Sequence, residues 1–211
     1  PKGAIVWKVI PDMIFRVSAG AGFRPPNVYE LYRTRTTRRT TYQSNPHLKP
    51  EEVRTCEAGV DLYPFNRKVR LSFTTYRNDI KNLIYYKAVP ETRIKTRVNA
   101  GKVRAYGWDF QGSYQIFPWL KLWGNLSYTE AEIKENPADQ ASEHKNVTGA
   151  PQTIWNLGLD AQGQWFRGSL SCGYFSKIYG DSDNQDTQEG VYRTYEPAFY
   201  VDGKITLTPW K

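Results

Sequence analysis

The strongest local charge feature of the sequence is a polar stretch that carries four arginines. They are Arg33, Arg35, Arg38 and Arg39, which are separated by threonines and flanked by Tyr32 and Tyr42. A guanidinium group binds carboxylates and phosphates through paired hydrogen bonds, and a tyrosine ring offers a flat face for stacking. The stretch therefore indicates capture of an anionic ligand, and a merely solvated surface segment is the alternative that the same residues allow.

The other polar residues offer little material for catalysis or metal binding. His47 and His144 are the only histidines, too few for a histidine metal cluster and a poor basis for a Ser, His and acid triad. One later stretch is acidic, with Asp181, Asp183, Asp186 and Glu189. Its spacing departs from the EF-hand loop, because Asp186 stands where glycine is needed and Tyr192 where the closing glutamate is needed. We expect no enzymatic activity, no cofactor and no metal centre; weak calcium binding by this stretch stays open.

Short runs of alternating apolar and polar residues surround these segments. In the run before the arginines, Met13, Phe15 and Val17 fall on one side of a strand, and Arg16 and Ser18 fall on the other. About nine such runs occur, at residues 4–9, 13–21, 55–62, 69–74, 106–116, 120–129, 155–162, 166–174 and 199–207. The connections between them are alternately short and long, with 78–97 and 130–150 interpreted as long loops. This pattern predicts an all-β fold, an antiparallel meander of about nine strands.

Composition indicates which kind of β protein this is. Aromatic residues make up 15% of the chain, yet the mean hydropathy is −0.66. A membrane barrel has both properties, because only every second strand residue meets lipid. Aromatic residues also gather at both strand ends, near the short turns (Phe65, Phe117, Trp119, Trp165, Trp210) and near the long loops (Tyr76, Tyr128, Trp155, Tyr174, Tyr195). Two such belts are typical of membrane interfaces, and a soluble β-sandwich is the alternative.

Two motifs bracket the arginine-rich stretch. Phe23, Arg24, Pro25 and Pro26 precede it, and Asn45, Pro46, Leu48, Lys49, Pro50 and Glu51 follow it. The pair resembles a signature of TonB-dependent outer-membrane receptors, in which a Phe-Arg-Ala-Pro box and an Asn-Pro-x-Leu-x-Pro-Glu box bracket one extracellular loop. Pro25 replaces the usual alanine. The segment 98–109 also resembles a pattern of the next strand in this family, Asn-x-Gly and then Gly-x-Glu, with Asp109 in place of the glutamate.

The resemblance implies an architecture. The nine strands would form part of a 22-stranded transmembrane β-barrel, and residues 1–211 would be a partial barrel domain. A plug domain and a TonB-contacting segment are expected before it and further strands after it. The implied location is the outer membrane of a Gram-negative bacterium. The implied function is import of a bulky scarce nutrient, first of all a ferric siderophore, with cobalamin or another chelate as alternatives.

The resemblance also implies partners. These are an extracellular iron chelate, the TonB complex, the protein's own plug, and outer-membrane lipid with lipopolysaccharide. Haem receptors of this family carry a histidine between the two boxes, and residues 28–44 contain none. The net charge of +8 is spread over turns and strand faces, so we expect no nucleic acid. An outer-membrane barrel enzyme or a passive porin remains as another interpretation.

The alternation also predicts which residues share a face of the barrel wall. Lipid-facing residues would be Val69, Leu71, Phe73, Trp155, Leu157, Leu159, Phe166, Leu170 and Cys172. Lumen-facing residues would be Arg70, Ser72, Asn156 and Ser171. Tyr32, Arg33, Arg35, Arg38, Arg39 and Tyr42 would then form a ligand-binding loop on the extracellular side.

Overall fold

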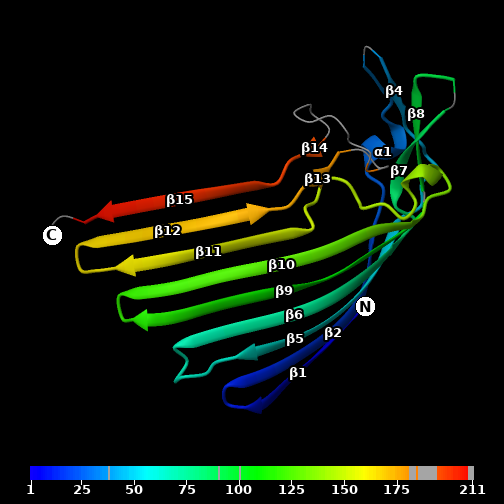
Figure 1. Cartoon of the computed structure of the whole chain (residues 1–211). Coiled ribbons are helices and arrows are strands. Elements are labelled where there is room, and N and C mark those ends of the chain that lie inside the picture. Colours follow the sequence, from blue (N-terminus) through cyan, green and yellow to red (C-terminus); the bar gives the residue numbers. More distant parts are fainter. Residues whose placement is uncertain (38, 90, 100, 181–183, 185–193, 209–211) are drawn as a thin grey trace.

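A curved antiparallel sheet forms most of the molecule (Figure 1). The computed structural model describes residues 1–37, 39–89, 91–99, 101–180, 184 and 194–208. Among these residues the sheet has nine strands: β1 (Lys2–Ile10), β2 (Met13–Arg24), β5 (Glu51–Leu62), β6 (Val69–Lys81), β9 (Lys102–Phe117), β10 (Leu120–Glu135), β11 (Thr153–Gln162), β12 (Phe166–Phe175) and β15 (Ala198–Leu207). Each strand pairs with the next in this order, so the predicted meander is confirmed.

The strand register separates the two faces of the sheet. One row across four strands consists of Phe73, Phe110, Leu126 and Trp155. The next row, one residue along, consists of Ser72, Gln111, Asn125 and Asn156. Directly opposed residues share a face and neighbours along a strand do not. The apolar and polar residues that the sequence assigns to different faces therefore lie on opposite faces.

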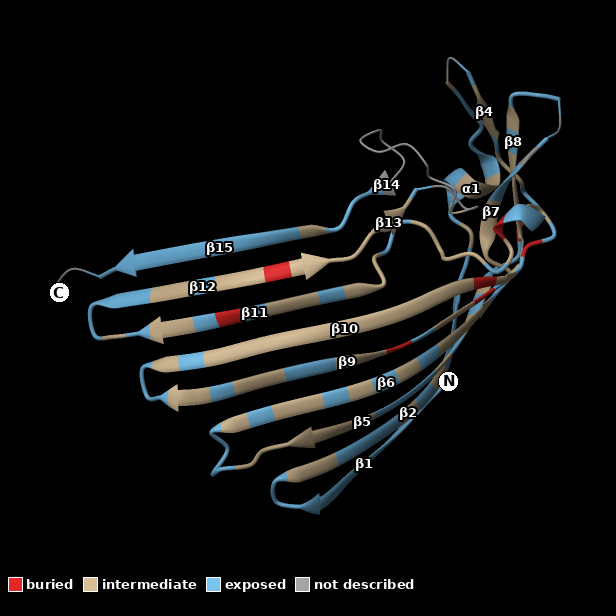
Figure 2. Ribbon diagram, in the orientation of Figure 1, coloured by how far each residue is buried: buried red, intermediate tan, exposed pale blue. Residues whose placement is uncertain are grey.

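The apolar face is exposed. Leu170 retains 55% of its accessible surface and Leu157 retains 49%. Among the described residues, the only buried large apolar side chains are Leu48, Val103 and Ile133. Figure 2 shows the few buried positions mostly towards the loop end of the sheet, and no second layer covers the described strands. A single sheet with one exposed apolar face does not fit a β-sandwich, which buries that face, and suits a wall that faces lipid.

The polar face carries its own hydrogen bonds and close contacts. Arg16 pairs with Asp61 at 2.9 Å. The Tyr76 hydroxyl hydrogen-bonds to the hydroxyl of Thr129, which lies on this face. The sequence places Tyr76 in the outer aromatic belt, and this expectation is wrong because its side chain is on the polar face. Trp155 and Tyr174 stack on the other face with centroids 6.1 Å apart. Trp210 lies outside the described residues.

The long connections gather at one end of the sheet, opposite the short turns (Figure 1). They contain α1 (Val28–Tyr32), η1 (Gln140–Ser142), the pair β13 (Ile178–Tyr179) and β14 (Thr194–Tyr195), and a second sheet of β3 (Arg35–Thr36), β4 (Thr41–Gln43), β8 (Ile94–Asn99) and β7 (Ile84–Ala88). The expected loops 78–97 and 130–150 begin too early, because β6 continues to Lys81 and β10 to Glu135. No helix among the described residues is long and apolar enough to cross a membrane.

Candidate ligand-binding site

Two of the long connections build one small sheet and one pocket. The first loop (residues 25–50) supplies α1, β3 and β4, and the second loop (residues 82–101) supplies β7 and β8. The loops join through parallel pairing of β4 with β8, in which Gln43 is opposite Thr96. A cavity of about 470 Å³ opens there, lined by Tyr29, Arg33, Arg35, Tyr42, Tyr86 and Arg97. We call it the arginine–tyrosine pocket.

The rings and guanidinium groups of this pocket pack against one another. Tyr42 and Tyr86 meet edge to face, with centroids 5.1 Å apart and planes at 76°. The Arg97 guanidinium lies over the Tyr86 ring at 4.9 Å, and that of Arg33 lies over Tyr29 at 4.9 Å. Such contacts hold the cations in place and leave the N–H groups, which lie in the guanidinium plane, able to donate.

Arg97 has a nitrogen that the described residues do not satisfy. Its Nη1 atom is buried and has no hydrogen-bond partner among them. An unsatisfied buried donor costs about 1–3 kcal/mol, and more when it is charged. Arg97 also lines the pocket, so an anion that reached this nitrogen would supply the missing acceptor.

The structure brings together some of the residues that the sequence singled out. Arg33, Arg35 and Tyr42 line the pocket. Tyr32 is 69% exposed, and neither it nor the exposed Arg39 lines the pocket. Arg38 lies outside the described residues, as do Asp181, Asp183, Asp186 and Glu189. Among the described residues, no cluster of three or more His, Cys, Asp or Glu side chains could hold a metal.

Tyr29, Tyr86 and Arg97 are pocket residues that sequence reasoning missed. Tyr29 precedes the arginines by only a few residues, so a wider window would have included it. Tyr86 and Arg97 belong to the second loop, and no signal in the sequence links that loop to the first. Their contribution depends on the parallel β4–β8 pairing, which joins residues 53 positions apart.

Helix α1 begins with a capping box formed by Asn27 and Glu30, and Glu30 also binds Arg24 of the first motif. The Asn27 side chain accepts from the Glu30 N–H at 2.8 Å, and the Glu30 carboxylate accepts from the Asn27 N–H at 2.8 Å. Both contacts satisfy backbone donors that a helix start leaves free. The Arg24 Nη1 donates to the same carboxylate at 3.1 Å. The first turn of α1 is thereby anchored to the end of β2.

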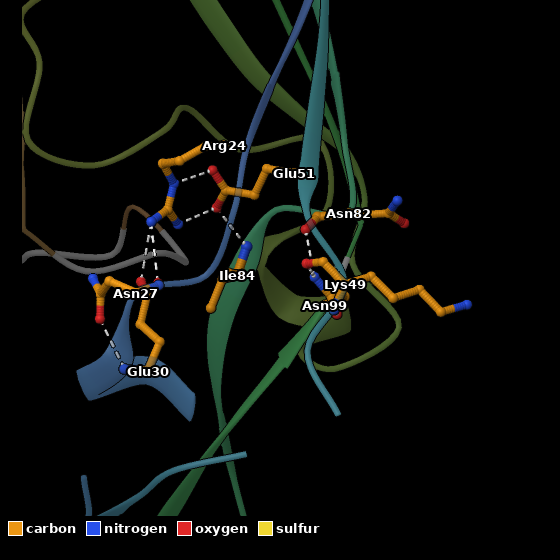
Figure 3. A network of polar contacts seen from close by, with 8 residues as sticks. All are labelled: Arg24, Asn27, Glu30, Lys49, Glu51, Asn82, Ile84 and Asn99. Atoms are coloured by element: carbon orange, nitrogen blue, oxygen red, sulfur yellow. Dashed lines mark hydrogen bonds and ion pairs between the residues drawn. The ribbon is translucent and has the colours of Figure 1, made fainter. Parts of the chain in front are cut away.

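Arg24 of the first motif and Glu51 of the second form a bidentate ion pair (Figure 3). The Arg24 Nε donates to the Glu51 Oε2 at 2.6 Å, and its Nη2 donates to Oε1 at 2.7 Å. The Ile84 N–H, at the start of β7, donates to the same Oε1 at 2.9 Å. The hydrogen bond from Arg24 lowers the pKa of the Glu51 carboxyl; burial opposes this shift and the Ile84 N–H adds to it.

Asn99 and Asn45 add further bonds between the loops. The Asn99 side chain accepts from the Lys49 N–H at 2.6 Å and donates to the carbonyls of Lys49 and Asn82, both at 2.8 Å (Figure 3). The Asn45 side chain donates to the Arg97 carbonyl at 2.9 Å, and its N–H donates to the Glu30 carbonyl at 3.0 Å. Both motifs thus contact the second loop or the helix that supports the pocket.

Comparison with known proteins agrees with this architecture. Residues 1–209 match the family model described as "TonB dependent receptor-like, beta-barrel". The chain is 22% identical over 200 residues to the metal-pseudopaline receptor CntO of Pseudomonas aeruginosa, covering 93% of this chain and 26% of that protein. It is 35% identical over 71 residues to the vitamin B12 transporter BtuB of Vibrio vulnificus, covering 33% of this chain and 10% of that protein.

Solved structures show the same fold. A variant of the ferric enterobactin receptor of Pseudomonas aeruginosa superposes with a TM-score of 0.77 at 17% identity, over 99% of this chain and 32% of that one. The chain therefore spans about a third or less of the length of the proteins it resembles.

Proposed function

The chain belongs to the TonB-dependent receptor-like β-barrel family, and from that premise we propose that the whole protein is a transporter that imports an anionic metal chelate. Members of the family are non-enzymatic transporters of the Gram-negative outer membrane. The described strands would supply barrel wall, and the two loops would capture the ligand outside the cell. A plug domain, the TonB complex and surrounding lipid with lipopolysaccharide are the partners that this proposal includes.

The observation that supports an anionic ligand is a pocket lined by three arginines, one of which, Arg97, has a buried Nη1 without a hydrogen-bond partner among the described residues. An uncharged ligand would leave this donor without a strong acceptor. Among the relatives, the names cover a metal–pseudopaline complex, vitamin B12 and ferric enterobactin. We propose a siderophore-type chelate with deprotonated oxygens and flat rings, because guanidinium forks suit the oxygens and tyrosine faces suit the rings.

The test is binding of iron(III) tris(2,3-dihydroxybenzoate), an anionic aromatic chelate, to the intact receptor. Arg97→Gln should weaken binding by about tenfold or more, because a hydrogen bond to a charged group is worth about 1.5–3 kcal/mol. Arg54→Gln is the matched control, since Arg54 lies at the loop end of β5 but does not line the pocket. Equal affinity of Arg97→Gln and wild type would exclude this pocket as the binding site.

Competition distinguishes the ligand classes. The anionic chelate should be displaced by other anionic iron chelates and not by an uncharged ferric hydroxamate or by cobalamin. Displacement by cobalamin at equal concentration would contradict the proposed preference for anions. Transport in cells with and without TonB then tests whether the bound chelate is imported.

A further inference from the structure

The two motifs around the first loop contribute no side chain to the arginine–tyrosine pocket, although they bracket it in the sequence. We propose that Arg24, Asn45, Glu51 and Asn99 form an interloop clasp that assembles this pocket from its two loops. These four residues would be positioning residues for ligand capture. The inference rests on the proposed function for its ligand, and its first test needs no ligand.

The clasp contacts lie close to the pocket residues along the chain. Ile84, which donates to Glu51, stands two residues before Tyr86 on β7. Asn99 stands two residues after Arg97 on β8, and Asn45 binds the Arg97 carbonyl directly. Because side chains two positions apart on a strand share a face, fixing the base of each strand fixes the direction of its pocket residue.

The first loop is held in the same way. The Glu30 carboxylate that binds Arg24 belongs to α1, next to Tyr29 and three residues before Arg33. The Asn45 N–H donates to the Glu30 carbonyl at 3.0 Å. The helix that supports one side of the pocket is therefore tied both to the end of β2 and to the last part of its own loop.

The clasp is anchored on the nine-stranded sheet. Arg24 is the last residue of β2 and Glu51 the first of β5, and the two are directly opposed in the sheet. Asn99 reaches Asn82, the residue after the end of β6. The large sheet thus provides a fixed base from which both loops extend.

Each side-chain nitrogen of Arg24 and each carboxylate oxygen of Glu51 makes at least one hydrogen bond within the protein, which fits a positioning role. Arg24 uses Nε and Nη2 for Glu51 and Nη1 for Glu30. Both carboxylate oxygens of Glu51 accept hydrogen bonds, one of them also from Ile84.

The small sheet of β3, β4, β8 and β7, which we call the loop sheet, has short strands. The clasp would therefore contribute to keeping the pocket formed. Strands β3 and β4 contain two and three residues, and β4 joins β8 through three residue pairs. Ligand affinity falls in proportion to the fraction of molecules in which the pocket is formed. If loss of the clasp left the pocket formed in about a tenth of the molecules, the apparent Kd would rise about tenfold.

The first experiment measures amide hydrogen exchange of the intact receptor without ligand. The Glu51→Ala/Asn99→Ala variant should exchange faster than wild type at β4 and β8, with the large sheet unchanged. Glu135→Ala is the control, because the Glu135 side chain pairs with Lys102 at the same end of the sheet and takes no part in the clasp. Unchanged exchange in the loop sheet of the double variant would overturn the proposal, whatever the ligand is.

The second experiment is rescue by a disulfide. Gln43 and Thr96 are opposed in the β4–β8 ladder, and the Thr96 hydroxyl donates to the side-chain amide oxygen Oε1 of Gln43 at 3.2 Å. Neighbouring strands lie about 4.8 Å apart, which is within the Cα separation that a disulfide allows. Gln43→Cys/Thr96→Cys is introduced into the Glu51→Ala/Asn99→Ala receptor, with Cys56→Ser and Cys172→Ser to remove the native free thiols.

The probe is iron(III) tris(2,3-dihydroxybenzoate). The clasp variant should bind it about tenfold more weakly than wild type. The oxidised disulfide form should bind at nearly wild-type affinity, and the reduced form should bind as weakly as the clasp variant. Wild-type affinity in the clasp variant, or an oxidised form as weak as the reduced one, would overturn the positioning role. No binding by wild type would instead count against the proposed function, and hydrogen exchange would still decide on the clasp.

Discussion

Arginines of the candidate site differ in what surrounds them. The Arg97 guanidinium stacks on Tyr86 and keeps a buried nitrogen without a partner among the described residues. Arg35 and Arg39 are exposed. Burial strengthens a charged hydrogen bond, whereas solvent screens an exposed charge. Arg97 should therefore act chiefly on how long a ligand stays, and the exposed arginines chiefly on how fast it arrives.

The Arg24–Glu51 pair predicts a pH dependence at low pH. The folded state lowers the pKa of Glu51, so its stabilisation is fully present above the ordinary Glu pKa of about 4.3 and is lost as pH falls through the lower folded value. The difference in Tm between wild type and Glu51→Gln should stay constant from about pH 5 to 8 and shrink towards pH 3. A difference that is as large at pH 3 would show that the charge of Glu51 is not its source.

Gly158 on the polar face of β11 leaves room for the Trp123 ring because it has no side chain. A Cβ there would lie 2.4 Å from Trp123 Cζ2, whereas one at Gly168 would meet nothing closer than 4.0 Å. Gly158→Ala should displace the Trp123 ring and destabilise the barrel by about 1–3 kcal/mol. Gly168→Ala should change stability by less than about 0.5 kcal/mol. Urea unfolding of both variants checks this, and equal effects would contradict the close contact.

At the scale of the strand, sidedness predicts opposite tolerance at neighbouring positions. Leu71 lies on the apolar face and Arg70 on the polar face of β6. Leu71→Arg should cost about 2–4 kcal/mol, because it places a charge against lipid, and Arg70→Leu should cost much less, because that face meets water. The yield of heat-resistant folded barrel in outer membranes measures both. Similar losses for the two variants would mean that the faces are assigned wrongly.

The strands within the wall were predictable because the pleat enforces an alternation that the sequence records. In β6, Val69, Leu71 and Phe73 alternate with polar residues, and this run was recognised. The sequence predicts a loop from Asn78 onwards, whereas β6 continues to Lys81. Beyond the aromatic row both faces of a strand are polar, so the alternation that identifies a strand is lost there.

The loop sheet was not predictable from local patterns. Its strands β3 and β4 have two and three residues, which is too short for a period to appear. The parallel pairing of β4 with β8 joins two loops separated by the whole of β5 and β6. The family resemblance marked Arg24, Asn45 and Glu51 as important, but only their contacts show that they join the two loops.

At the scale of the whole molecule, the loops that carry the pocket lie at one end of the sheet (Figure 1), and the net charge is +8. Cations around a site attract an anionic ligand from a distance and raise its association rate. This attraction extends over about 8 Å in physiological salt. Steering by the first loop should therefore be separable from binding in the pocket by its dependence on salt.

The last prediction uses that separation. Replacing Arg33, Arg35, Arg38 and Arg39 with Gln should slow association of the anionic chelate about tenfold at low salt. The difference should shrink as salt rises, because exposed charges are screened. Since Arg33 and Arg35 also line the pocket, a faster dissociation should persist at all salt concentrations, as in Arg97→Gln. Arg39→Gln alone should change only the association rate. Stopped-flow binding across a salt series measures both rates, and wild-type association of the quadruple variant at low salt would show that this loop does not steer the ligand.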